Sequence, residues 1–424
     1  MFRGQYIKNV FFLITGTAAA QLINIAFMPF ITRIFGPESL GGLGYYSSLL
    51  SLLIPLAALC YPLAIILPAK RVEASALFEI SLKIAVVISL IIGFSLYGYE
   101  YFFKRLIIFD RSYFIIPLGV FLSVLVMAYT QWAISCGQYR LISLVTVLVA
   151  LVGGIGKVFM GYLFPTTITL VLINLFTVII SAIILSFKTS VSIKLDGLLY
   201  LRKRDYVIAK KYLRFAVYRT PHAMMAVISQ TAPVFLLTIF YGAQYAGYFV
   251  LTKTILSAPV MLVGKAIYDV SFPKITQRYN QGLPNLVFVK STTLALFALS
   301  SLPLIIIFLF GEEMFLIVFG PSWEMSGTYA VWMTLWFSFN LSNKAISAAV
   351  SVYEMDGFLF YNGVLNMILS ISGFFVGLIY FNSHVASVAL FSLFGIVAQI
   401  VLIVKVIWVI SKSDQLIILN ERKG

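Results

Sequence analysis

Charged residues are scarce in this sequence, and acidic residues are the scarcest. Only 11% of the 424 residues are charged, and the 15 Asp and Glu are outnumbered by 30 Lys and Arg. Ordinary soluble domains are about one-quarter charged. Because 61% of the residues are apolar, a soluble core could not bury enough of them. The composition therefore excludes an ordinary soluble domain and indicates an integral membrane protein.

Residues that usually carry catalysis or hold metal ions are also few. The chain has two histidines, His222 and His384, and two cysteines, Cys60 and Cys136, which both fall in apolar runs. It has no HExxH motif, no nucleotide-binding glycine loop and no pair of carboxylates inside an apolar run. We therefore predict that the protein is not an enzyme and that it has no cofactor, metal site or disulfide.

Long apolar runs recur from residue 9 to residue 410. Each run is close to the roughly 20 residues that a helix needs to cross a bilayer. The sequence therefore predicts an all-α integral membrane protein with about 12 transmembrane helices. The predicted helices cover residues 9–32, 43–67, 80–97, 113–135, 140–162, 167–187, 215–240, 246–268, 287–310, 325–350, 358–380 and 384–410.

Basic residues lie mainly on one side of this arrangement. With the N-terminus in the cytoplasm, the inner segments carry 20 Lys and Arg and the outer loops carry 4. The positive-inside rule then predicts that both termini are cytoplasmic. The same rule explains the net charge of +15, so a nucleic-acid partner is not needed to explain it. The densest basic segment, 188–214, is predicted to link two lobes, 1–187 and 215–424, and to contact anionic phospholipid at the inner leaflet.

The two predicted lobes are related by a weak internal repeat. A shift of 206 residues places FGPESLGGL, which begins at Phe35, on YGAQYAGYF, and it pairs Gly36 with Gly242. The same shift places the helix at 9–32 on residues 215–238. We expect these glycines to turn the chain at helix ends. Because six helices is an even number, the repeat predicts two six-helix lobes of the same orientation around a central cavity.

Three segments resemble those of a known family. They are PFITRIFGPESLGGLGYYSSLLSLLIPL, AGYFVLTKTILSAPVMLVGKAIYDVSFPKI and MFLIVFGPSWEMSGTYAVWMTLWF. Together with twelve predicted spans and a basic segment in mid-chain, they resemble the polysaccharide transporter family, whose O-antigen flippases are called Wzx. The resemblance implies the fold of the multidrug/oligosaccharidyl-lipid/polysaccharide exporters. It also implies a bacterial inner-membrane flippase that moves an undecaprenyl-pyrophosphate-linked repeat unit to the periplasmic leaflet.

Basic residues inside the predicted spans support an anionic substrate. No acidic residue is central in a predicted span, so a basic side chain there requires water or an anion to offset its burial. Six basic residues within predicted spans are the candidates: Lys157, Arg219, Lys253, Lys265, Lys344 and Lys405. Two of these, Lys265 and Lys405, lie close enough to the inner interface for their side chains to reach it. We predict that Lys157, Lys253 and Lys344 line the substrate cavity, and that Arg219 joins them or lies at the interface.

Neutral polar residues are the remaining candidates for substrate binding. His222 lies on the same helix face as Arg219, and Gln21 and Asn24 lie on one stripe of the first predicted helix. Asn340 and Asn343 share a face with Lys344. Amides beside a cation suit a glycan attached to a phosphate, because sugar hydroxyls need hydrogen-bond partners. The alternative is that these stripes only join helices by hydrogen bonds.

The predicted partner is a lipid-linked oligosaccharide, and contact with the polysaccharide polymerase machinery is an implied possibility. A flippase for another anionic lipid-linked precursor is an alternative. A multidrug exporter is a second alternative, but cationic drugs favour a buried carboxylate. The lack of a central carboxylate predicts that membrane potential and consumption of the glycan supply the direction of transport, with ion antiport left open.

Overall fold

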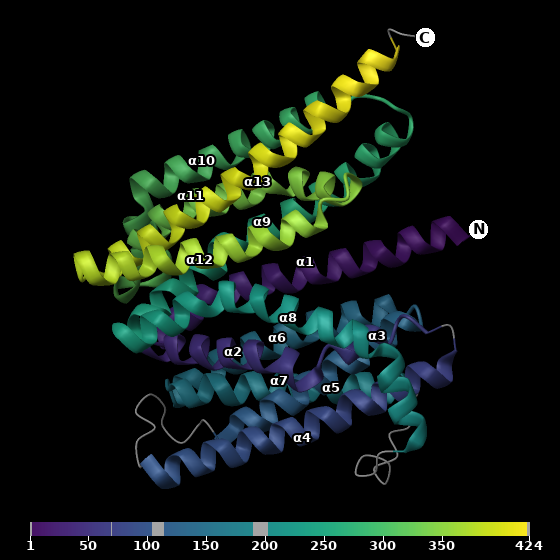
Figure 1. Cartoon of the computed structure of the whole chain (residues 1–424). Helices are drawn as coiled ribbons and strands as arrows, with labels where there is room; N and C mark the ends of the chain where they lie inside the picture. The colour runs from purple at the N-terminus through teal and green to yellow at the C-terminus, as the bar shows by residue number, and fades with distance from the viewer. Residues whose placement is uncertain (1, 69, 104–113, 190–201, 422–424) are drawn as a thin grey trace. The chain divides into compact units, whose positions relative to one another are not determined.

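The computed structural model describes residues 2–68, 70–103, 114–189 and 202–421, and this part of the chain is helical with short connections (Figure 1). Its long helices are α1 (Phe2–Ile34), α2 (Pro37–Ala58), α4 (Arg71–Phe103), α5 (Ile116–Ser135), α6 (Tyr139–Leu163), α7 (Thr167–Thr189), α8 (Lys203–Phe240), α9 (Ala243–Asn280), α10 (Leu286–Phe319), α11 (Glu324–Val352), α12 (Asp356–Phe381) and α13 (His384–Glu421). Two short elements, α3 (Tyr61–Ala64) and the 3-10 helix η3 (Pro321–Trp323), lie between them. The predicted all-α membrane fold is confirmed.

Eleven of the long helices in the described part are long and apolar enough to cross a membrane. The exception is α11, more than half of whose residues are buried. It packs against α9, α10, α12 and α13. A helix that is surrounded by other helices exposes little surface to lipid, so it can carry more polar residues than its neighbours. We therefore treat α11 as the central helix of its bundle.

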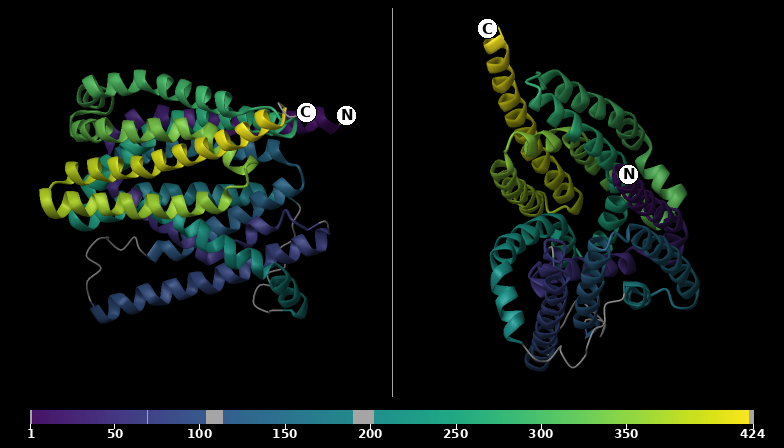
Figure 2. Two further views of the ribbon diagram at one scale, coloured as in Figure 1. Left: turned by 45° about the horizontal axis from the view of Figure 1, so that its top comes forward. Right: turned by 90° about the vertical axis from the view of Figure 1, so that its right-hand side faces the viewer.

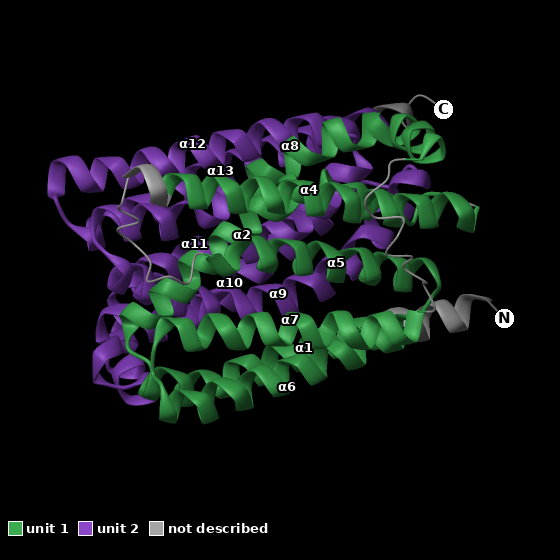
Figure 3. Ribbon diagram, turned by 90° about the horizontal axis from the view of Figure 1, so that it is seen from below, with its two compact units in different colours: residues 1–227 green, residues 228–424 purple. Residues whose placement is uncertain are grey.

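The chain divides into two compact units, residues 1–227 and 228–424 (Figure 3). Within unit 1, α1 packs on α6, α6 on α7, and α5 contacts α2, α4 and α7. Within unit 2, α11 has the central position and α12 packs along α13. The views in Figure 2 show the long helices of each unit running side by side. The predicted relation between two lobes around a central cavity stays a prediction.

The 206-residue shift also relates helix ends. Helix α1 ends at Ile34 and α2 begins at Pro37, while α8 ends at Phe240 and α9 begins at Ala243. The predicted turns are confirmed, since Gly36 precedes α2 and Gly242 precedes α9. Their conformations differ, however. Gly36 has φ −71°, which any residue adopts, whereas Gly242 has φ +109°, which favours glycine.

Several helices are longer than the sequence predicts. Residues 190–201 of the predicted basic linker lie outside the described part, but α8 already begins at Lys203, so the second half of that linker is helical. Glu79, Asp269, Glu312 and Asp414 all lie within helices. All four lie outside the predicted spans, so these helices extend beyond the apolar windows. Apolar windows end at the first charges, whereas backbone hydrogen bonding continues through polar residues.

Candidate functional site: a polar cavity in unit 1

Unit 1 contains a cavity of about 380 Å³ between α1, α5, α6 and α7. Small-ligand pockets usually measure about 300–1,000 Å³, so this volume suits part of a headgroup rather than a whole glycan. The polar residues that line it are Asn24, Thr130, Thr146, Lys157, Asn174, Thr177 and Ser181. Among the described residues, no acidic side chain lines the cavity.

Lys157 supplies the charge of this cavity. It lies on α6, one turn after Gly153, and its side chain is half-buried. Within the described residues its ammonium group has neither an ion-pair partner nor a hydrogen-bond acceptor. A basic side chain at such a depth is stable when it faces water or an anion. Lys157 therefore lines a cavity within unit 1, and its role in substrate binding stays a prediction.

Asn24 and Asn174 add amide groups from α1 and α7. An amide offers two N–H donors and one acceptor oxygen. Asn174 also lines a second cavity of about 160 Å³, which it shares with Tyr46, Ser47 and Ser123. It therefore lies where two cavities of unit 1 approach one another. The two amides and the Lys157 ammonium are the hydrogen-bond donors available to an anion.

The hydroxyl groups of the cavity act mainly as acceptors. Thr177 donates to the carbonyl oxygen of Asn174 at 2.7 Å, and Ser181 donates to that of Thr177 at 2.9 Å. Thr130 and Thr146 donate in the same way to carbonyls of their own helices. Because each hydroxyl proton is already used, the oxygen is left with acceptor capacity. Such oxygens suit ligand hydroxyls, which are donors.

Sequence reasoning missed Asn174, Thr177 and Ser181. The steps of three and four residues between them put these side chains on one face of α7. That spacing could have identified them, because all other residues from Leu170 to Leu185 are apolar. Gln21, by contrast, was predicted but does not line either cavity of unit 1, although Asn24 lies one turn further along α1.

Arg219 and His222 lie on α8, in unit 1, and both side chains are exposed. Neither lines the cavities of that unit. The cavity with Lys157 is formed by α1, α5, α6 and α7, and α8 contributes no residue to it. Substrate binding by this pair stays a prediction.

Lys253 and Lys344 lie in unit 2. The Nζ of Lys253 donates to the backbone carbonyl of Gln230 at 2.7 Å, which joins α9 to α8. The methylene groups of Lys344 lie against Gly264 on α9. A side chain added at position 264 would collide with them. Both lysines are half-buried and have no ion pair within the described part of the chain. Their exposure to a central cavity stays a prediction.

Asn343 has a clear structural contact. It is buried, and its Nδ2 donates to Oε1 of Gln399 on α13 at 2.8 Å. This hydrogen bond joins the central helix of unit 2 to a neighbour, which was the alternative considered for this stripe. Asn340 lies almost one turn earlier and is half-buried.

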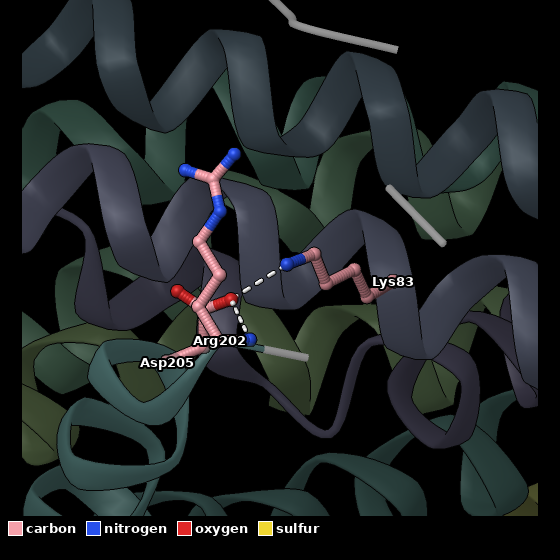
Figure 4. Close-up of polar contacts among 3 residues, drawn as sticks. All are labelled: Lys83, Arg202 and Asp205. Carbon is pink, nitrogen blue, oxygen red and sulfur yellow. Dashed lines mark hydrogen bonds and ion pairs between the residues drawn. The ribbon is translucent and has the colours of Figure 1, made fainter. Parts of the chain in front are cut away.

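A buried ion pair in unit 1 was not predicted (Figure 4). The Nζ of Lys83 on α4 lies 2.6 Å from Oδ2 of Asp205 on α8, and both side chains are almost fully buried. The backbone N–H of Arg202 donates to the same carboxylate oxygen at 3.2 Å. The sequence analysis singled out neither residue, because the two are 122 positions apart and only the tertiary fold brings them together.

Two more contacts attach the start of α8 to unit 1. The Nζ of Lys211 lies 2.7 Å from Oε2 of Glu73, and the hydroxyl of Tyr61 donates to the carbonyl of Ala209 at 3.1 Å. Ile208 and Ala216 are buried in the same apolar cluster as Phe78. The first four turns of α8 therefore have a fixed place on α3 and α4.

The comparison with protein families identifies the chain. Residues 30–327 match the model of the family described as "Polysaccharide biosynthesis protein". The chain belongs to this family. A search of curated proteins finds no match.

Solved structures of the MOP superfamily share the fold of this family member. An inward-facing MATE family multidrug resistance transporter is 14% identical over 95% of both chains, with a TM-score of 0.70. The lipid II flippase MurJ in an inward closed conformation is 12% identical over 97% of this chain and 91% of its own, with a TM-score of 0.72. A MOP superfamily transporter from Pyrococcus furiosus, described as having a binding pocket of reversed polarity, is 12% identical over 96% of both chains, with a TM-score of 0.59.

At these identities the likeness establishes the fold. The chain is a multi-pass membrane protein of the polysaccharide biosynthesis family with a MOP superfamily fold. The resemblance drawn from the sequence is confirmed at this level.

Proposed function

We propose that the protein is a flippase, without enzymatic activity, that moves an undecaprenyl-pyrophosphate-linked O-antigen or polysaccharide repeat unit across the bacterial inner membrane. In this proposal both termini are cytoplasmic, and the headgroup moves from the cytoplasmic to the periplasmic leaflet. The family and the fold support a transporter of this general kind. The specific substrate comes from the resemblance drawn from the sequence, and the chemistry of the cavity supports an anionic headgroup.

The observation that carries the proposal is the unneutralised Lys157 in a polar cavity without acidic residues. An ammonium group and two amides offer donors to a phosphate, and the hydroxyl oxygens of Thr130, Thr146 and Thr177 offer acceptors to sugar hydroxyls. A volume of about 380 Å³ suits the pyrophosphate and the first sugar. The polyprenyl chain would remain in lipid, because it gains nothing from a polar cavity.

Lys253, Lys344, Arg219, His222, Asn340 and Gln21 belong to the proposal as further contacts for the glycan along its path. These residues are predicted from the sequence, and they lie on α1, α8, α9 and α11. Anionic phospholipid at the inner leaflet and the polysaccharide polymerase machinery are proposed as partners outside this path.

A flippase for another anionic lipid-linked precursor is the second candidate, and the likeness to MurJ favours it. Multidrug export is disfavoured, because a cationic drug would meet the like charge of Lys157 without an acidic residue to offset it.

The test uses purified protein in proteoliposomes with fluorescent undecaprenyl-pyrophosphate-linked oligosaccharides, lipid II and a cationic dye as three separate cargoes. The proposal expects translocation of the first. Translocation of lipid II alone would support the second candidate, and transport of the dye alone would overturn both flippase proposals.

A further inference from the structure

One end of unit 2 holds a buried carboxylate that the transport proposal does not use. Asp414 lies on α13 and is 4% exposed. Its Oδ2 accepts a hydrogen bond of 2.7 Å from the backbone N–H of Leu286, the first residue of α10. Within the described residues its Oδ1 is buried and has no hydrogen-bond donor. Burying a carboxylate oxygen without a hydrogen-bond donor costs free energy, unless another group or ion interacts with its lone pairs.

Asn285, the residue before Leu286, presents a second such oxygen. It is fully buried. Its Nδ2 donates to the carbonyl of Ile275 and to the hydroxyl oxygen of Tyr353, both at 3.3 Å. These bonds use the amide donors and fix the orientation of the side chain, while Oδ1 is left buried without a donor in the described part of the chain.

Tyr353 follows the last residue of α11, and its ring packs at 5.0 Å on that of Tyr279. Burial raises the pKa of the Tyr353 phenol, the hydrogen bond from Asn285 lowers it, and the charge of Asp414 raises it. The phenol therefore lies within the electrostatic reach of the carboxylate and stays neutral. Four helices, α9 to α11 and α13, supply residues to this small group.

Among the described residues, no basic side chain forms an ion pair with Asp414. The part of the chain that the structure describes has two ion pairs, and both lie in unit 1. Lys412, the basic residue nearest to Asp414 along the chain, has its Nζ 4.4 Å from the centre of the Trp408 ring, and Arg278 donates to the carbonyl of Pro284. Hydrogen bonds thus join Asp414 to Leu286, and the adjacent Asn285 to Tyr353. Within the described residues, one carboxylate oxygen and one amide oxygen of this group have no hydrogen-bond donor.

We propose that Asp414, Asn285 and Tyr353 bind a monovalent cation such as Na⁺ or K⁺. Hard cations take oxygen ligands from carboxylates, amide carbonyls and hydroxyls. One carboxylate balances one positive charge, whereas a divalent ion would leave a buried excess charge. Binding would satisfy both buried oxygens, and it would join α10, α11 and α13 at one end of unit 2.

The experiment measures equilibrium binding of radiolabelled Na⁺, and its displacement by K⁺, with the full-length protein in detergent. The wild type should bind Na⁺ saturably, and Asp414→Asn should weaken binding about tenfold or more, as loss of a charged ligand does. The amide of the new Asn can still accept from Leu286 N–H, so the helix cap is kept. Asp356→Asn is the matched control, because Asp356 is exposed at the start of α12; its binding should equal that of the wild type.

Tyr353→Phe provides a second variant, since it keeps the ring against Tyr279 and removes only the hydroxyl. It should weaken binding less than Asp414→Asn does. Absence of saturable Na⁺ or K⁺ binding by the wild type would overturn the site. Equal binding by the wild type and a folded Asp414→Asn would also overturn it, and if that variant does not fold, unchanged binding by Tyr353→Phe decides against it. No lipid-linked substrate is needed, so this result is independent of the flippase proposal.

Discussion

The Nζ of Lys83 lies 2.6 Å from Oδ2 of Asp205, with 5% and 0% of the two side chains exposed. The pair joins α4 to the first turn of α8, directly after the segment 190–201 that the structure does not describe. Because Asp205 also accepts from the N–H of Arg202, it caps α8 and neutralises Lys83 at once. The buried ion pair thus fixes the start of α8 against α4.

Replacing Lys83 with Met should destabilise unit 1. It leaves the buried Asp205 carboxylate without its counter-ion, which costs about 3–5 kcal/mol of unfolding free energy. Unfolding in detergent, followed by tryptophan fluorescence, measures this. The double variant Lys83→Met/Asp205→Asn should recover much of the loss. Lys211→Met, at the more exposed pair with Glu73, is the control and should change stability little. A Lys83→Met protein as stable as the control would contradict this role.

Replacing Asn343 with Leu should lower stability rather than substrate affinity. The change removes the donor to Gln399, whose buried oxygen is then unpaired, at a cost of about 1–3 kcal/mol. Adding Gln399→Leu should restore most of that loss, since both polar groups are then gone. Thermal unfolding and binding of the lipid-linked oligosaccharide to the folded fraction are measured together. Unchanged stability with lost binding would instead support the substrate role predicted from the sequence.

Gly377 should not tolerate a side chain. A Cβ at this position of α12 would collide with the backbone of Ser387 on α13, so Gly377→Ala should force the two helices apart. Overpacking of this kind costs about 1–3 kcal/mol. Gly363→Ala is the control, because on the same helix nothing lies within contact distance of its added Cβ. Equal melting temperatures of the two variants would show that this close approach is absent.

Flipping should respond to membrane potential. A pyrophosphate that carries about two negative charges gains roughly 2.3 kcal/mol per charge for each 100 mV when it leaves a negative cytoplasm. Proteoliposomes with an imposed potential and no ion gradient should therefore flip the glycan faster when the starting side is negative. Flipping that ignores potential but follows a Na⁺ or H⁺ gradient would support ion antiport instead.

The helices could be predicted from the sequence because apolar length decides them. All twelve long helices have a counterpart among the predicted spans, and the turns at Gly36 and Gly242 lie where the 206-residue shift places them. Helix ends were less predictable. Asp414 and Asp269 lie inside helices, since polar residues beyond the apolar window still continue the backbone hydrogen bonds.

The candidate site could be predicted only in part. Lys157 and Asn24 stood out because each interrupts an apolar run. Lys83 did not, because its partner is far along the chain and such pairs are set by tertiary packing. The threonines of the cavity have hydroxyls bonded to their own helices, so only the packing of α5 against α6 shows that their oxygens face a shared space.

The charge of Lys157 is the most direct test of the account. Flipping of an undecaprenyl-pyrophosphate-linked oligosaccharide is measured in proteoliposomes for the wild type, Lys157→Gln and Lys157→Arg, at equal amounts of folded protein. Loss of a charge-assisted hydrogen bond should slow flipping by Lys157→Gln about tenfold or more. Lys157→Arg, which keeps the charge, should retain most of the activity. Equal flipping rates for Lys157→Gln and the wild type would contradict a substrate site in the cavity of unit 1.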